Sequence, residues 1–142
     1  MRKRIAAAAT VVVLAACGRT AAPHVDLEGA FVPGLVEVTL PYGEQIQIAG
    51  TVLDLILTDV PEDSRCPTDV TCVWAGNAVV EVGIRAGMGP TFLLRLNTTL
   101  EPRSAEWNDI RVTLLDLTPL PMSGATIIPA DYSVRIRLEP VS

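Results

Sequence analysis

Residues 132–139 read Tyr-Ser-Val-Arg-Ile-Arg-Leu-Glu, and this alternation decides the fold. Apolar side chains at positions 132, 134, 136 and 138 alternate with polar or charged ones. Because successive side chains of an extended chain point to opposite faces, the stretch predicts a β-strand with one face in the core and the other in water. No segment of helical period exceeds two turns, so we expect an all-β protein.

The same two-residue period recurs along the chain between Pro, Gly and Asp residues that predict turns. The other predicted strands are residues 36–40, 45–48, 52–60, 77–85, 91–97 and 109–117. Residues 86–90, Ala-Gly-Met-Gly-Pro, predict a hairpin turn. Segment 52–60 is apolar on both faces except at Asp54, which favours a central strand covered on both sides. Residues 104–107 are compatible with one helical turn, because Ser104 precedes an acid.

About seven strands in about a hundred residues favour an antiparallel two-sheet β-sandwich of immunoglobulin-like architecture over a closed barrel. We place this single domain at residues 31–142. The proline-rich segments 118–121 and 128–129 predict a long connection between two strands.

Residues 1–16 have the composition of a secretory signal peptide. Three basic residues at positions 2–4 precede a largely apolar run at 5–13 and then small residues. The run is too short to span a bilayer as a stable anchor. Residues 14–17, Leu-Ala-Ala-Cys, resemble the lipobox of bacterial lipoproteins. That resemblance implies cleavage before Cys17, a thioether link to diacylglycerol and acylation of the new amino terminus. The alternative is an ordinary signal peptide with an incidental cysteine.

Residues 17–30 are then a lipidated cysteine and a short tether. A lipid-anchored protein of the cell envelope is expected, with palmitate among the acyl groups. Gly18 follows the cysteine where an Asp commonly retains Gram-negative lipoproteins in the inner membrane, so the resemblance implies the outer membrane, facing the periplasm, if the source is Gram-negative. His24, the sole histidine, lies in this tether.

The mature chain is acidic. Cleavage removes Arg2, Lys3 and Arg4 from eleven cations and none of the sixteen acids, which leaves a net charge of −8. Such a surface repels nucleic acid and anionic lipid headgroups, so the predicted partners are the membrane, through the N-terminal lipid, and an envelope protein. Because the folded body contains no histidine, Ser-His and Cys-His pairs are excluded there, as are histidine-rich metal sites; we expect no cofactor and no metal.

The most distinctive segment of the chain is residues 63–76, which read Asp-Ser-Arg-Cys-Pro-Thr-Asp-Val-Thr-Cys-Val-Trp-Ala-Gly. With Cys17 assigned to lipid, Cys66 and Cys72 remain as an even pair in an oxidising compartment and should form a disulfide. Closing so short a ring stabilises the fold by only about 2 to 2.5 kcal/mol, so its role is local. Pro67 and Asp69 favour a tight turn inside the ring.

The pattern D-S-R-C-P, four residues, C-x-W-x-G resembles a segment of uncharacterised bacterial envelope lipoproteins, and implies an exported β-rich domain with a disulfide loop but no activity. Two interpretations of its largest side chains stay open. In the first, Trp74 covers the disulfide while Arg65 pairs with Asp63 or lies on the indole face, which makes a structural corner. In the second, Arg65 and Trp74 are exposed anchors for a partner.

The sequence predicts the cellular location of the protein more clearly than its function, for which three hypotheses remain. We expect a binding or structural module without enzymatic activity. The alternative is a protease-inhibitor-like module that presents loops. A carboxylate-dependent hydrolase comes third, with Asp54, Glu62, Asp63 and Asp69 as its candidate acids. Calcium binding by the acidic segment 59–69 is a further alternative, although the segment lacks an EF-hand pattern.

Overall fold

The computed structural model describes residues 34–141. The predicted signal peptide, Cys17 and His24 lie outside the described residues. Eight strands and one short 3-10 turn make up the described part. They are β1 (Val36–Pro41), β2 (Gln45–Gln47), β3 (Leu53–Asp63), β4 (Ala78–Ala86), β5 (Phe92–Asn97), β6 (Ser104–Trp107), β7 (Ile110–Thr118), η2 (Pro129–Asp131) and β8 (Ser133–Pro140).

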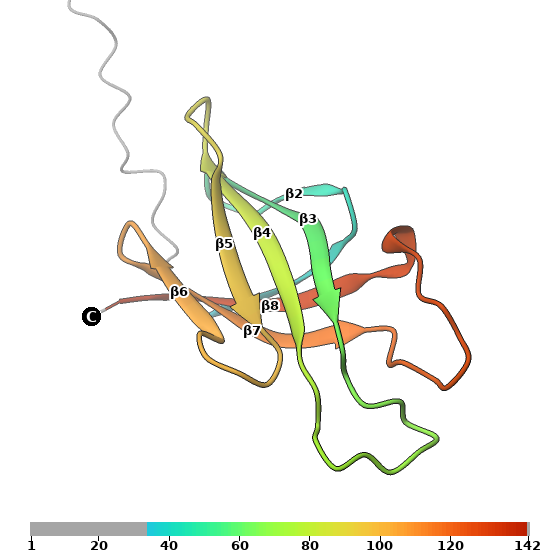
Figure 1. Ribbon diagram of the computed structural model, residues 1–142. Helices are drawn as coiled ribbons and strands as arrows, with labels where there is room; N and C mark the ends of the chain where they lie inside the picture. Colours follow the sequence, from blue (N-terminus) through green and yellow to red (C-terminus); the bar gives the residue numbers. More distant parts are fainter. Residues whose placement is uncertain (1–33, 142) are drawn as a thin grey trace, which may run out of the picture.

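The strands form two four-stranded sheets that pack face to face (Figure 1). One sheet has the order β1-β8-β7-β6 and the other β2-β3-β4-β5, and all neighbouring strands are antiparallel. Each sheet is a run of strands consecutive along the chain, except that β1 lies beside β8. The predicted antiparallel two-sheet sandwich is therefore confirmed.

A single apolar core lies between the sheets and receives alternate residues of the long strands. The residues that are at most 1% exposed include Leu53, Leu55, Leu57, Val80, Val82 and Ile84 from one sheet, and Val112, Leu114, Val134, Ile136 and Leu138 from the other. This is the two-residue period that predicted the strands. Burial of these side chains is the main favourable contribution to folding, at roughly 1.5 to 3 kcal/mol for each.

Two predictions about individual segments are wrong. Residues 104–107 form β6 rather than a helical turn, because they pair with β7 across a tight turn at Asn108 and Asp109, whose φ angles are 45° and 57°. This short strand is the eighth, where about seven were expected. Segment 52–60 forms the inner strand β3, but only one of its faces is in the core: Asp54, Ile56 and Thr58 are half-buried on the outer face.

The connections collect at two ends of the sandwich. At one end, which we call the loop end, lie the β3–β4 loop (64–77), the β5–β6 connection (98–103) and the long β7–β8 connection (119–132). The β3–β4 loop projects beyond the sheets at the bottom of Figure 1. At the opposite end lie the β4–β5 and β6–β7 hairpins, the start of β1 and the end of β8.

Candidate functional site

The base of the β3–β4 loop continues the antiparallel pairing of its two strands. The Ser64 amide donates to the Asn77 carbonyl at 2.7 Å, and the Cys66 amide donates to the Ala75 carbonyl at 2.9 Å. The Ser64 hydroxyl also donates to the Asn77 carbonyl, at 2.9 Å. These bonds hold the two sides of the loop close together up to the disulfide.

Cys66 and Cys72 form the predicted disulfide, with their Cα atoms 6.0 Å apart. Inside the ring the Val70 amide donates to the Pro67 carbonyl at 3.4 Å, in line with the predicted turn. The ring therefore fixes the outer half of the loop, where a polar chain without a core contact would otherwise sample many conformations.

Gly76 allows the two sides of the loop to approach. Its φ angle is +70°, and a Cβ atom at this position would lie 1.8 Å from the carbonyl oxygen of Ser64. Any other residue would both strain the backbone and collide with Ser64. The glycine at the end of the C-x-W-x-G pattern thus has a structural explanation.

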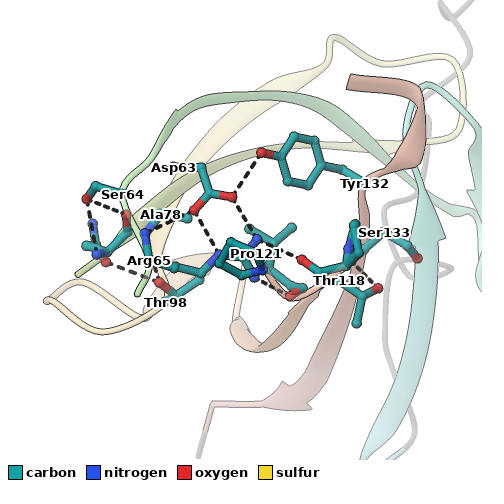
Figure 2. A network of polar contacts seen from close by, with 12 residues as sticks. Asp63, Ser64, Arg65, Ala78, Thr98, Thr118, Pro121, Tyr132 and Ser133 are labelled. Carbon is teal, nitrogen blue, oxygen red and sulfur yellow. Dashed lines mark hydrogen bonds and ion pairs between the residues drawn. The ribbon is translucent and has the colours of Figure 1, made fainter. Parts of the chain in front are cut away.

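The Arg65 side chain, at the base of the loop, is only 10% exposed and makes hydrogen bonds to residues at or just past the ends of strands in both sheets (Figure 2). Its Nε donates to Asp63 Oδ1 at 2.9 Å and its Nη2 to Asp63 Oδ2 at 2.7 Å, a two-bond fork that confirms the predicted Arg65–Asp63 pair. Nη2 also donates to the Pro119 carbonyl at 2.9 Å, and Nη1 donates to the Leu117 carbonyl. The guanidinium therefore connects the end of β3 in one sheet to the end of β7 in the other.

Tyr132 completes this group, which we call the Arg65 clamp. The Tyr132 hydroxyl donates to Asp63 Oδ2 at 2.9 Å from just before β8. Burial raises the pKa of the Asp63 carboxyl, but the hydrogen bonds from Arg65 and Tyr132 outweigh burial and hold that pKa below its ordinary value. Burial, followed by the bond to Asp63, raises the pKa of the Tyr132 hydroxyl to about 12. Asp63 is thus charged and Tyr132 neutral at physiological pH.

A second set of bonds attaches the loop to the β7–β8 connection. The Thr68 amide donates to the Pro121 carbonyl at 2.9 Å, and Ser123 donates both its amide and its hydroxyl to the Asp69 carboxylate. The bonds from Ser123 lower the pKa of Asp69. The polar residues of the loop are therefore occupied in holding it to the sandwich.

Trp74 is the exception. Its side chain is 81% exposed and that of the neighbouring Val73 is 91% exposed. The interpretation that Trp74 packs over the disulfide is therefore wrong, whereas the burial of Arg65 is as that interpretation required. Of the two residues proposed together as anchors, only Trp74 is available at the surface.

An open hollow of about 490 Å³ lies beside the indole of Trp74. Its lining also includes Ala75, Asn77 and Leu100, and Leu100 is 59% exposed. We call the exposed side chains of Val73, Trp74 and Leu100, together with this hollow, the Trp74 surface. It is predominantly apolar and lies at the loop end.

Sequence reasoning missed several of the residues that build this site. Asn77 positions Leu100, because its Oδ1 accepts the Thr99 amide at 3.0 Å and the Leu100 amide at 3.3 Å. Tyr132 was predicted only as a core residue of its strand. The partners of these residues lie 22 to 69 positions away along the chain, so no local sequence pattern predicts these contacts.

The candidate acids of the hydrolase hypothesis do not converge on the Trp74 surface. Asp54 pairs with Arg85 at 2.8 Å on the outer face of its sheet, Asp63 belongs to the Arg65 clamp and Asp69 binds Ser123. Among residues 34–141, no three His, Cys, Asp or Glu side chains gather closely enough to hold a metal ion. Within that range, none of the helices has the length and apolar character needed to cross a membrane.

Comparisons with known protein families, curated proteins and solved structures found no match to this chain. The site has two parts: a polar base that holds the loop to both sheets, and an apolar, exposed tip.

Replacing Arg65 tests the base of the loop. We expect Arg65→Ala to lower the free energy of unfolding by about 3 kcal/mol, because it leaves the largely buried Asp63 carboxylate without its cation. Arg65→Lys keeps the charge but loses the fork, so we expect a loss of about 1 to 2 kcal/mol. Chemical denaturation of the domain without its lipid measures both. In the control Arg95→Ala, an arginine that is 60% exposed and 3.4 Å from Glu81, the loss should stay below about 1 kcal/mol. Equal losses at positions 65 and 95 would contradict the clamp.

The lowered pKa of Asp63 predicts a pH dependence. Because the folded pKa lies below the unfolded value of about 3.9, the ionised carboxylate contributes stability that is fully present above pH 4 and is lost as the pH falls through the folded pKa. We expect the Tm difference between the wild type and Asp63→Asn to be large at pH 7 and to shrink below about pH 4. Thermal melts from pH 7 to pH 2 measure it, and a constant difference over this range would refute the prediction.

Proposed function

We propose that this protein is a lipid-anchored module of the cell envelope that makes contact with a partner through the Trp74 surface. The proposed anchor is Cys17, in the segment that resembles a lipobox. The disulfide between Cys66 and Cys72 supports export, because such bonds persist in oxidising compartments. Two or three acyl chains would attach the domain durably, whereas one chain binds a membrane only marginally.

The observation that carries the binding role is an exposed tryptophan on a rigid loop. Val73 and Trp74 are 91% and 81% exposed, yet the loop that bears them is held by a disulfide and by the Arg65 clamp. Exposing a large ring gives no stability to the fold, whereas tryptophan contributes strongly to binding. A loop held in one conformation also loses little entropy when a partner binds.

The other two hypotheses have weaker support. A projecting disulfide loop also suits an inhibitor-like module, which remains the alternative. For a hydrolase, two carboxyl groups must flank a substrate, whereas Asp54, Asp63 and Asp69 are engaged by Arg85, Arg65 and Ser123. These contacts favour structural roles for the three acids.

The lipid anchor is tested by Cys17→Ala. We expect this variant to lose labelled palmitate and to leave the membrane fraction, because the apolar run before it is too short to anchor the chain. Metabolic labelling and membrane sedimentation measure the two effects. The control is Cys66→Ala with Cys72→Ala, which removes the disulfide and should leave labelling unchanged. A Cys17→Ala protein that still sediments through hydrophobic attachment would argue against the anchor.

The binding surface is tested by photo-crosslinking in cells. A photoreactive amino acid in place of Trp74 should give adducts with lipid or with protein, and the same amino acid in place of Met88 should give neither. Met88 is the matched control, because it is 100% exposed but lies in the β4–β5 hairpin at the opposite end. Both replacements are at exposed sites and should alter stability by no more than about 0.5 kcal/mol. Equal adduct formation at both positions, or none at either, would exclude the Trp74 surface as the binding surface.

A further inference from the structure

We infer that the partner of the Trp74 surface is the bilayer itself: the tip of the β3–β4 loop enters the interfacial region of a membrane of zwitterionic lipids. The inference rests on the lipid anchor of the proposed function and names the partner of the same surface. The protein would then have two membrane contacts, the acyl chains on Cys17 and the loop tip with Val73 and Trp74.

The composition of the tip suits a lipid interface. Residues 70–80 include no charged side chain, and within them Val70, Val73 and Trp74 are 48%, 91% and 81% exposed. Tryptophan is enriched where water meets lipid, because its ring is largely apolar while its indole N–H can stay hydrogen-bonded. An uncharged tip can therefore enter the interface without transferring a charge out of water.

The net negative charge of the protein favours zwitterionic lipids over anionic lipids. The mature chain has a net charge of −8, so anionic headgroups would repel it. The two acids at the start of the loop and inside its ring are held by hydrogen bonds, Asp63 in the Arg65 clamp and Asp69 to Ser123. Zwitterionic headgroups carry no net charge, and the apolar tip can approach them.

The small size of the Trp74 surface favours a membrane over a protein partner. A stable protein interface uses about 20 to 30 residues on each side, whereas this surface has three exposed apolar side chains around one hollow. A contact this small is weak for a freely diffusing partner. For a domain already tethered to the bilayer the second contact is intramolecular, so a weak affinity is sufficient.

The tether is long enough for this contact. Residues 18–33 separate Cys17 from Gly34, and at about 3.3 to 3.6 Å per residue they span up to about 55 Å. The chain enters the sandwich at Val36, opposite Leu138 and away from the loop end, whereas Pro41 at the other end of β1 pairs with Ser133. Because β1 is only about 20 Å long, the tether can reach back past the sandwich and leave the loop end free to meet the bilayer.

The experiment places the lipidated mature chain, which begins at Cys17, in phosphatidylcholine vesicles whose acyl chains carry bromine. In the Trp107→Phe variant, Trp74 is the sole tryptophan, and phenylalanine preserves an aromatic partner for Phe92, whose ring centroid is 5.8 Å from that of Trp107. We expect the Trp74 emission to shift to shorter wavelength and to lose most of its intensity relative to vesicles without bromine. The matched control, Trp74→Phe, retains only Trp107, on β6 at the opposite end, and should keep its emission.

Flotation of the vesicles separates the possible failures. A chain that does not float with the vesicles overturns the anchor and this inference together. A chain that floats while bromine leaves the Trp74 emission unchanged overturns this inference alone, and a protein adduct from the position of Trp74 would then assign the surface to a protein partner. Replacing part of the phosphatidylcholine with phosphatidylglycerol at low salt should reduce the quenching; an increase would contradict the selection for zwitterionic lipid.

Discussion

Arg65 is the residue on which the arrangement of the loop end depends. A β-sandwich holds its sheets together through the apolar core, but a polar loop outside that core has no such contact to position it. The Arg65 guanidinium supplies one, because its rigid set of donors reaches the Asp63 carboxylate, the Leu117 carbonyl of the other sheet and the Pro119 carbonyl just after that strand at once. Lysine, with one ammonium group, cannot offer the same planar geometry. The base of the loop is thereby held by both sheets.

The loop has a base whose polar groups are hydrogen-bonded within the protein and a tip whose apolar side chains are exposed to water. At the base, the polar groups of Ser64, Arg65 and Asn77 find partners within the protein. At the tip, Val73 and Trp74 remain in water although the core lies only a few residues away along the chain. Scattered exposed apolar side chains are ordinary on protein surfaces, so the proposed binding role depends on the position of Trp74 beside an apolar hollow.

The acidic body of the domain opposes contact with an anionic membrane, whereas the apolar tip favours contact with lipid. A strongly acidic domain is repelled by anionic headgroups, whereas an uncharged tip removes apolar area from water when it meets lipid. The proposed lipid anchor and the proposed contact of the loop tip would together restrict how the sandwich lies against the bilayer. The surface that then faces away from the membrane would include the β4–β5 hairpin, at the end opposite the loop.

Much of this structure follows from local sequence, because the features concerned depend on neighbours. The strands follow from a two-residue period that one strand carries by itself, and the Arg65–Asp63 pair joins residues two positions apart. The disulfide follows from the count of cysteines. Strand β6 escaped prediction because four residues carry too little pattern to outweigh a plausible helix cap.

What only the tertiary structure decided is which surfaces meet. Leu117 lies 52 residues from Arg65 and Tyr132 lies 69 residues from Asp63, so their contacts exist only after both sheets have formed. For the same reason the sequence named Arg65 and Trp74 together but could not separate them. Burial depends on what the rest of the chain brings nearby, and folding covered most of the Arg65 side chain at the loop end and left Trp74 in water.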